Sequence, residues 1–229
     1  MRLYVKIMLP MEDIQRKTEY LCYNGPIGNG DKHNHLKIKL GVSGAAETGH
    51  CGVHALDQAK ELGREIIRQG GVLVTGATTG FPLWASMGAK DEHGVVIGLS
   101  PAANEEEHVA TYKLPLDYTD LIIYTGFGFP GRDLLFTRSC DALFIGCGRI
   151  GTIHEFTIAF EDGKPIGILE GDWEMDKVLR DILEHGHRPN PKIVFDKDPK
   201  VLVQKIIALV AESKIPEYKL SKAQQAQEQ

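Results

Sequence analysis

From residue 37 onward, short apolar runs alternate with amphipathic segments, and this alternation constrains the fold more than any other feature of the sequence. The apolar runs predict strands at 37–43, 72–75, 95–99, 121–124, 143–145, 166–169 and 192–195. Helices are predicted at 54–69, 81–90, 131–138, 175–184 and 199–211, with a further helix around Glu155. Short apolar strands separated by helices are typical of a parallel sheet that is covered on both faces. We therefore predict an α/β protein with a Rossmann-like, doubly wound, mainly parallel sheet of about seven strands.

The chain of 229 residues divides by pattern into three parts. Residues 1–36 include a turn-rich stretch at 24–31, and we treat them as an N-terminal extension. Residues 37–213 carry the alternating pattern and form the predicted Rossmann-like nucleotide-binding domain. Residues 214–229 are polar and form the predicted C-terminal tail.

Charge and cysteine content argue against several classes of protein. A net charge of −5 is unlike that of a protein with a broad nucleic-acid-binding face. The sequence shows neither an apolar run near the ~20 residues that span a bilayer nor the apolar core of a signal peptide at its start. Cys22, Cys51, Cys140 and Cys147 are widely spaced, and the segment 50–54 (His-Cys-Gly-Val-His) completes no tetrahedral ligand set, so neither a disulfide framework nor a metal site is expected. We predict a cytoplasmic protein that uses no metal and no cofactor and has no nucleic-acid or membrane partner.

Glycine-rich loops follow four of the predicted strands. In an open parallel sheet, ligands bind at the carboxyl ends of the strands, near the point where the strand order reverses. The loops at 41–44, 76–80, 126–131 and 146–151 all fall at such ends, so we expect them to surround one binding site. The predicted phosphate- or nucleotide-binding residues are Gly44, Gly76, Thr78, Thr79, Gly128, Gly148, Arg149, Gly151 and Thr152.

The segment 146–155 combines a strand end, a glycine-rich turn and a helix start. Free backbone N–H groups and the positive end of a helix dipole suit a phosphate at such a place. Glu155 is expected on the first helical turn, close to the ligand. Arg132 follows another glycine-rich loop at an expected helix start, where a guanidinium opposes the dipole and suits an anionic ligand. Arg132 and Glu155 are therefore the candidate catalytic residues.

Two structural alternatives compete with this interpretation. The run from Thr152 to Glu155 also fits a helix capping box, in which Thr152 caps the helix and Glu155 bonds back to the backbone. Arg132 is equally consistent with a surface arginine that pairs with Asp133. Either alternative would leave the residues concerned without a chemical role.

A dinucleotide site is a third alternative. The pattern G-x-G-x-x-G occurs at 126–131 and again at 146–151, and Glu170 lies 19 residues after Gly151. That spacing is close to the ~20 residues of the dinucleotide fingerprint. These features allow an oxidoreductase that uses NAD or a flavin. We keep it as a minority hypothesis, because two matches in one chain show how readily the pattern arises.

Several stretches of the sequence resemble a known family. Residues 151–155, behind the glycines of the fifth strand, resemble the PGGxGTxxE signature of the LOG family, the cytokinin-activating phosphoribohydrolases long mislabelled lysine decarboxylases. Arg132 is similar to that family's arginine, and residues 75–89 resemble its GGxxGLMG segment. The runs 126–133 and 138–142 are more similar to the related molybdenum-cofactor carrier-like branch of the same Rossmann superfamily.

The resemblance covers residues 37–170 and includes two departures. The family's Pro-Gly-Gly is here Cys147-Gly148-Arg149, so the Arg149 side chain either binds the phosphate or blocks its site. Asp133 stands where cytokinin-type enzymes carry a basic residue. Nucleotide binding is therefore the better supported part of the resemblance, and hydrolysis the less supported part.

The resemblance implies an N-glycosidic hydrolase that cleaves nucleoside 5′-monophosphates to a base and ribose 5-phosphate. Glu155 would stabilise the oxocarbenium-like sugar or orient water and a ribose hydroxyl, and Arg132 would fix the substrate or help the leaving base. The alternative is a non-enzymatic carrier or sensor of a phosphorylated ligand such as the molybdenum cofactor. The expected partners are an AMP-like nucleotide or a phosphorylated cofactor, and a second copy of the chain in a homodimer or higher homo-oligomer.

Overall fold

The computed structural model describes residues 37–190 and 192–225. The predicted N-terminal extension lies outside the described residues. The strands are β1 (Lys39–Ser43), β2 (Val72–Thr75), β3 (Val96–Ser100), β4 (Leu121–Tyr124), β5 (Ala142–Ile145), β6 (Ile166–Leu169) and β7 (Ile193–Asp196). The α-helices are α2 (Ala55–Arg68), α3 (Phe81–Asp91), α4 (Gly128–Ser139), α5 (Ile150–Glu161), α6 (Met175–His185) and α7 (Pro199–Gln225), and a short π-helix η1 spans Glu107–Thr111.

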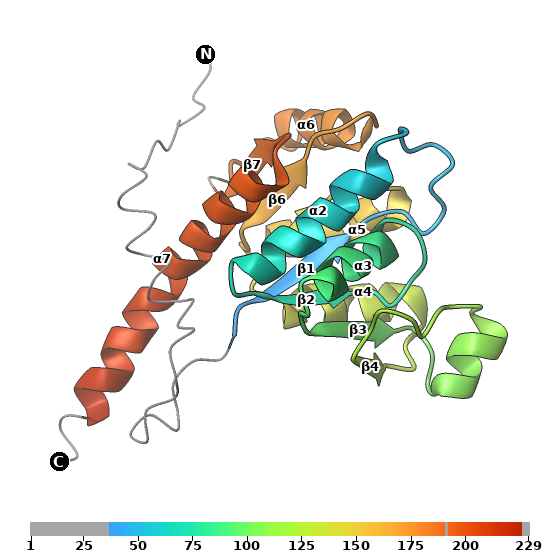
Figure 1. Ribbon diagram of the computed structural model, residues 1–229. Coiled ribbons are helices and arrows are strands. Elements are labelled where there is room, and N and C mark those ends of the chain that lie inside the picture. Colours follow the sequence, from blue (N-terminus) through green and yellow to red (C-terminus); the bar gives the residue numbers. More distant parts are fainter. Residues whose placement is uncertain (1–36, 191, 226–229) are drawn as a thin grey trace.

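All strands belong to one seven-stranded sheet in the order β4-β3-β2-β1-β5-β6-β7 (Figure 1). Each neighbouring pair is parallel. The predicted Rossmann-like fold is therefore confirmed. The chain builds the sheet outward from β1 to β4, returns to the other side of β1 with β5, and then builds outward to β7. The strand order thus reverses between β1 and β5, which is where such sheets open a crevice at the carboxyl ends of the strands.

Helices cover both faces of the sheet. On one face α2 packs against α3 and α7, and on the other α4 packs against α5 (Figure 1). β1, β2, β5 and β6 lie in the middle of the sheet and are almost wholly buried, which explains their nearly continuous apolar sequences. Phe136 of α4 and Phe156 of α5 fill the core between helices and sheet. These layers fix the positions of the loops that form the site.

The close contact of α2 and α3 depends on glycine. A Cβ on Gly63 of α2 would stand 1.9 Å from the carbonyl oxygen of Ala85, and a Cβ on Gly88 of α3 would stand 1.9 Å from the carbonyl oxygen of Lys60. Each helix therefore presents a glycine to the backbone of the other. This contact holds the second half of α3 close against α2.

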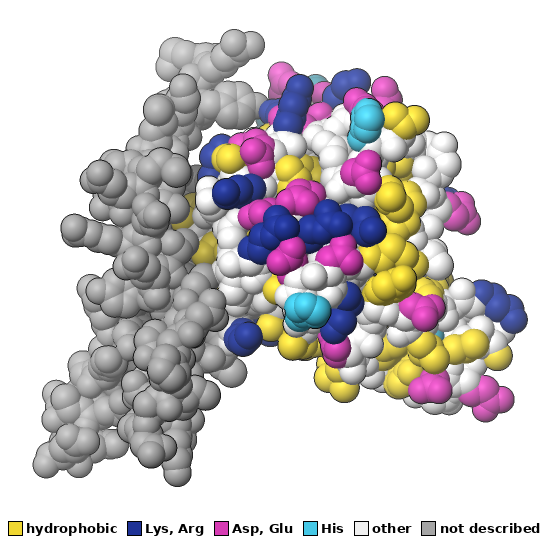
Figure 2. Space-filling view, in the orientation of Figure 1, with side chains coloured by type: hydrophobic (Ala, Val, Ile, Leu, Met, Phe, Trp, Pro, Cys, Tyr) yellow, Lys and Arg dark blue, Asp and Glu magenta, His cyan; other side chains and the backbone are white. Residues whose placement is uncertain are grey.

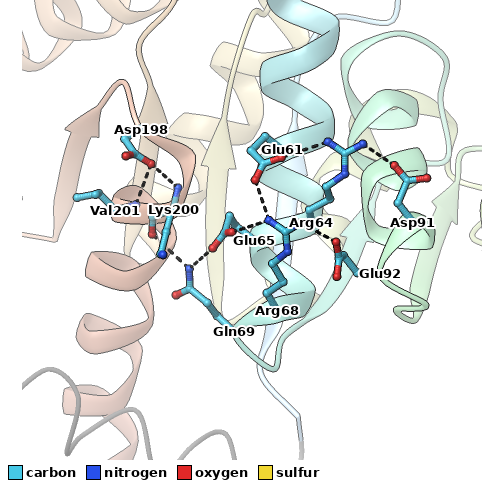
Figure 3. Close-up of polar contacts among 10 residues, drawn as sticks. All are labelled: Glu61, Arg64, Glu65, Arg68, Gln69, Asp91, Glu92, Asp198, Lys200 and Val201. Atoms are coloured by element: carbon cyan, nitrogen blue, oxygen red, sulfur yellow. Dashed lines mark hydrogen bonds and ion pairs between the residues drawn. The ribbon is translucent and has the colours of Figure 1, made fainter.

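The outer face of α2 carries a network of ion pairs. Figure 2 shows basic side chains bordered by acidic ones over α2 and α3. Arg64 Nη2 lies 2.6 Å from a carboxylate oxygen of Asp91, and Arg68 Nη2 lies 2.7 Å from one of Glu92 (Figure 3). Arg68 also pairs with the buried carboxylate of Glu65. The arginines are thus neutralised locally, and exposed pairs of this kind add little stability.

The main differences from the predicted elements concern helix ends. Helix α4 begins at Gly128 rather than at 131, and α7 runs to Gln225 rather than ending at 211. The π-helix η1 was not predicted. The early start of α4 was not predicted because the glycine-rich sequence is typical of a loop. Gly128 adopts a positive φ of 62° where the helix begins.

Candidate functional site

A cavity of about 370 Å³ opens at the point where the strand order reverses. Its walls come from the loop after β1, the loop after β2, the first turns of α4 and the first turns of α5. The lining residues are Val42, Ser43, Gly44, Ala45, Ala46, Gly76, Thr78, Pro82, Phe129, Arg132, Asp133, Arg149, Ile150, Gly151, Thr152 and Glu155. The four glycine-rich loops therefore converge on one end of the sheet.

The predicted site residues fall into two groups. Eight of them line the cavity together: Gly44, Gly76, Thr78, Arg132, Arg149, Gly151, Thr152 and Glu155. Thr79, Gly128 and Gly148 are outside this lining. The Thr79 hydroxyl instead donates a hydrogen bond of 3.1 Å to the carbonyl oxygen of Ala46, a residue that lines the cavity.

Several of the loop glycines serve packing. A Cβ on Gly76 would stand 1.7 Å from Nη1 of Arg132, so this glycine makes room for the guanidinium. A Cβ on Gly148 would meet the side chain of Thr152 at 2.6 Å. Gly151 is different, because a Cβ there would meet no atom of the described protein within 4 Å. Of these three glycines, only Gly151 leaves open space that a ligand can fill.

The capping-box alternative is wrong. Helix α5 begins at Ile150, with Arg149 as its N-cap, so Thr152 is the third helical residue rather than the cap. The Thr152 hydroxyl accepts a hydrogen bond of 3.3 Å from the backbone N–H of Arg149. Glu155 consequently lies on the second turn, one turn later than predicted, and its carboxylate bonds elsewhere. Ile150 and Gly151, as the first two helical residues, have backbone N–H groups with no intrahelical acceptor.

Arg132 is buried beneath the cavity. Its Nε lies 3.1 Å from a carboxylate oxygen of Asp133, and its Nη1 donates a short hydrogen bond to the carbonyl oxygen of Gly76. The guanidinium also lies over the ring of Phe129, 5.7 Å from the ring centroid. The predicted pairing with Asp133 is present, but the arginine is only 5% exposed and is therefore not a surface residue. Neither hydrogen bond uses Nη2, which leaves that donor for a ligand.

Glu155 is buried in the same wall. The Ser43 hydroxyl donates a short hydrogen bond to its carboxyl oxygen. Burial raises the pKa of the Glu155 carboxyl to about 8; the Arg132 cation lowers this pKa and the neighbouring Asp133 carboxylate raises it. Asp133, which is ion-paired with Arg132, adds to the effect of burial and favours the protonated form of Glu155. The site therefore presents a buried carboxylic acid at neutral pH.

Two participants in this network, Ser43 and His154, were not among the predicted site residues. Ser43 ends β1, and nothing in the strand pattern distinguishes its hydroxyl from any other polar strand end. His154 Nδ1 lies 2.9 Å from the second carboxylate oxygen of Asp133. Asp133 thus joins Arg132 to His154 across α4 and α5. The sequence offered one signal for this network, because Asp133 departs from the family pattern at its position.

Arg149 lies on the rim of the cavity. Its guanidinium forms a short ion pair with Glu47 of the loop after β1, and both side chains are more than half exposed. Exposed pairs are weak, so an anionic ligand can compete with Glu47 for this arginine. The geometry is consistent with a phosphate contact and does not close the cavity.

A disulfide joins two of the loops beside the site. Cys51, after β1, is bonded to Cys147, after β5, although 96 residues separate them. This bond corrects the expectation, drawn from the wide spacing of the cysteines, that the protein has no disulfide. His50 Nε2 lies 3.5 Å from Cys147 Sγ, and the ligand atoms of His50, Cys51 and Cys147 all lie within 4.8 Å of one another.

Glu170, the acidic residue of the dinucleotide alternative, lies away from the cavity. Its carboxylate forms a short ion pair with Arg180 of α6. It lines a separate surface hollow with Asp172, Lys197 and residues of α2. This position gives the dinucleotide hypothesis no support.

The part of the chain that the structure describes contains no helix whose length and apolar character would suit a membrane span.

Comparison with known proteins shows several relatives. The molybdenum cofactor binding protein from the phototrophic bacterium Rippkaea orientalis is 28% identical, with a TM-score of 0.63 over 77% of this chain and 99% of that one. The molybdenum cofactor carrier protein from Chlamydomonas reinhardtii is 26% identical, with a TM-score of 0.58 over 77% of this chain and 98% of that one. An uncharacterized protein of Archaeoglobus fulgidus is 31% identical over 133 residues, which are 58% of this chain and 80% of that protein.

A family model covers the same region. The model of the SLOG cluster4 family matches residues 37–203, from just before β1 into α7. The match thus includes every strand of the sheet and every loop that lines the cavity. It agrees with the predicted resemblance to the LOG superfamily near its molybdenum-cofactor carrier branch. Because the match spans well over half of the sequence, the chain belongs to the SLOG cluster4 family.

Proposed function

We propose that the cavity binds a small organic phosphate monoester, with the phosphate at the N-terminus of α5. The observation that carries this proposal is the arrangement around Gly151. The free N–H groups of Ile150 and Gly151 and the helix dipole favour an anion there. Open space at Gly151 lets the anion approach the backbone, and Arg149 on the rim supplies a cation.

Two classes of ligand fit this site. One is a nucleoside 5′-monophosphate such as AMP, as the LOG-like motifs imply. The other is a phosphorylated cofactor of the molybdenum-cofactor type, which the names of the Rippkaea and Chlamydomonas relatives suggest. In either case Arg132 Nη2 and the Glu155 carboxyl face the part of the ligand beyond the phosphate.

The decisive test places a methyl group where the phosphate is expected. Gly151→Ala adds a Cβ in open space, so the fold tolerates it and helix propensity improves by up to about 1 kcal/mol. Gly49→Ala is the matched control, because a Cβ on this exposed loop glycine also meets nothing within 4 Å. We expect Gly151→Ala to weaken AMP binding, measured by calorimetry, at least about tenfold, since each lost charge-assisted hydrogen bond contributes roughly 1.5–3 kcal/mol. Equal affinities for AMP in the two variants would refute this placement of the phosphate.

A second candidate function is hydrolysis of the N-glycosidic bond of a bound nucleoside 5′-monophosphate. The specific observation that favours it is the buried acid: Glu155 carries a proton at neutral pH beside the Asp133 carboxylate. A protonated carboxyl can donate to the departing base, and a nearby carboxylate can stabilise the positive charge that develops on the sugar. Water then adds to the sugar carbon and gives ribose 5-phosphate, and the proton that this water loses returns to the Glu155 carboxylate. Arg132 holds the Asp133 carboxylate in place and offers Nη2 to the substrate.

Product analysis separates the two functions. Purified protein is incubated with a panel of nucleoside monophosphates, and free base and ribose 5-phosphate are quantified by chromatography. A hydrolase releases both in equal amounts, and Glu155→Gln abolishes this release because an amide cannot donate the proton. Turnover by the Gln variant near the wild-type rate rules out the acid role. No release, with a phosphorylated ligand retained on purification, identifies a carrier or sensor.

We also propose that the protein is a homodimer or higher homo-oligomer. The support is an exposed apolar edge: β4 ends the sheet, and Leu121 and Ile123 on it are 55% and 47% exposed. An unpaired apolar strand edge favours association with a second copy. Light scattering tests this, because the monomer mass is 25.3 kDa and Ile123→Lys is expected to shift a dimer toward that mass.

A further inference from the structure

The disulfide crosses the crevice of the sheet. Cys51 lies in the loop between β1 and α2, and Cys147 lies in the loop between β5 and α5, so the bond links the two sides of the point where the strand order reverses. The Cys147 loop leads directly into the proposed phosphate site. A second contact supports the same link, because His50 Nε2 lies 3.1 Å from the carbonyl oxygen of Gly148.

The two sulfur atoms differ in access and in surroundings. Cys51 is partly exposed, whereas Cys147 is fully buried. The Gly148 carbonyl can only accept a hydrogen bond, so His50 Nε2 carries a proton, and that proton also faces Cys147 Sγ at 3.5 Å. Cys147 further lies three residues before the first residue of α5, at the positive end of the helix dipole. Both features stabilise a thiolate on Cys147.

We propose that Cys51–Cys147 is a thiol–disulfide exchange site that controls the phosphate loop, with a dithiol as the reductant. A thiolate of the dithiol attacks Sγ of Cys51, the bond to Cys147 breaks, and its electron pair leaves on Cys147 Sγ, which then takes up a proton. The second thiol of the dithiol attacks the mixed disulfide, releases Cys51 as a thiol and leaves as a disulfide. Two electrons and two protons pass to the protein, and a disulfide oxidant reverses the reaction.

Reduction removes the strongest connection between two walls of the cavity. The contacts left between these loops include the hydrogen bond of 2.8 Å from the backbone N–H of Ala45 to the carbonyl oxygen of Cys147, and the exposed Arg149–Glu47 pair. Ala45 and Arg149 both line the cavity. The link to affinity rests on the proposed function, a phosphate monoester at this loop. Without the disulfide, the two loops must become ordered when the ligand binds, and this ordering costs free energy. We therefore expect the reduced protein to bind AMP about tenfold more weakly than the oxidised protein.

Exchange is favoured where the attacked cysteine is exposed to solvent and the leaving thiolate is stabilised. Here Cys51 is the more exposed of the two residues, and the surroundings of Cys147 stabilise its thiolate. Cys140 provides the internal comparison. It is buried, its thiol donates to the carbonyl oxygen of Phe136, and burial raises its pKa strongly, so it stays unreactive while the protein is folded.

The first experiment tests exchange without any ligand. The full chain, purified under air, is titrated with dithiothreitol, trapped with iodoacetamide and mapped by mass spectrometry. Cys51 and Cys147 are expected to become alkylated together and only after reduction, while Cys140 stays unlabelled. His50→Ala is expected to slow reduction about tenfold through the loss of the hydrogen bond to the leaving thiolate. His54→Ala is the matched control, since this exposed residue makes no side-chain cap on α2.

Three results overturn the exchange site. The first is alkylation of both cysteines without a reductant. The second is protection of both thiols by a co-purified metal ion until a chelator is added, which would make the His50 cluster a metal site. The third is equal reduction rates for the His50 and His54 variants.

The second experiment measures control of the loop. Binding of AMP and of inorganic phosphate is compared for the oxidised protein, the reduced protein and Cys51→Ser. We expect the reduced protein and Cys51→Ser to share the weaker affinity. If the oxidised and reduced proteins bind AMP equally well, the disulfide does not control the phosphate loop, even where thiol–disulfide exchange occurs. Absence of binding by every form refutes the proposed function and the control together, while the labelling result still decides the exchange site.

Discussion

Glu155→Gln is expected to make the protein more stable at neutral and alkaline pH. The substitution keeps the side-chain volume and an oxygen that accepts the hydrogen bond from Ser43, and it adds an N–H that can donate to Asp133. What it removes is a carboxyl group that must ionise as the pH rises. A residue proposed for chemistry thus lowers the stability of the fold, as is common at functional sites.

The magnitude follows from the pKa of Glu155, which burial raises from 4.5 to about 8. A raised carboxyl pKa means that the folded protein binds more protons than the unfolded chain between these two values. Stability is therefore complete below pH 4.5 and is lost as the pH rises toward 8. With 1.36 kcal/mol for each pKa unit, the loss amounts to roughly 3 kcal/mol at pH 7 and approaches about 5 kcal/mol above pH 9. The variant does not suffer this loss.

The assay is thermal or urea unfolding of both proteins at pH 5, 7 and 9. The two stabilities should differ by less than about 1 kcal/mol at pH 5, and at pH 7 the variant should melt about 6–12 °C higher. Glu161→Gln is the control, because it removes an exposed carboxylate from the same helix. A constant difference between wild type and Glu155→Gln at all three pH values would refute the reasoning, since it would show a packing effect rather than a titration.

The remaining predictions concern packing and covalent links. Gly63→Ala should destabilise the protein by about 2–4 kcal/mol in urea unfolding despite the better helix propensity of alanine, because its Cβ meets the carbonyl oxygen of Ala85; a stabilised variant would contradict this contact. Cys51→Ala should lower the free energy of unfolding by up to about 4–5 kcal/mol, as expected for opening a loop of 96 residues, and unchanged denaturation under reducing and oxidising conditions would count against the bond. Arg132→Met removes the cation that lowers the pKa of Glu155, so the loss of stability that begins near pH 4.5 should continue to a higher pH than in the wild type; a loss that ends at lower pH would contradict the assigned role.

Much of the fold follows from local pattern alone. β2, β4 and β6 have the predicted bounds, because each is a short apolar run flanked by glycine, proline or polar residues. The clustering of Arg132, Arg149 and Glu155 was also predictable, because loops at the carboxyl ends of parallel strands meet at one edge. Which of these residues bind or react is still a prediction that the proposed experiments test.

Other features could not be read from local pattern, because they depend on residues far apart in the sequence. The start of α5 at Ile150 ruled out a capping box that the sequence fits well. The pKa of Glu155 depends on burial beneath the loop after β1 and on Asp133 from another helix. Likewise Gly76 is required by a guanidinium 56 residues away. In each case a contact made only in the folded chain decides the role of the residue.

The sequence by itself determined the alternating elements, the parallel sheet and the end of the sheet at which a ligand binds, because short-range periodicity and chain connectivity fix these. Only the tertiary structure decided that Cys51 meets Cys147, that Arg132 is buried on Asp133, and that Glu155 holds a proton at neutral pH. Those properties depend on the distance between loops and on the exclusion of water between packed layers, and neither is encoded in the spacing of residues along the chain.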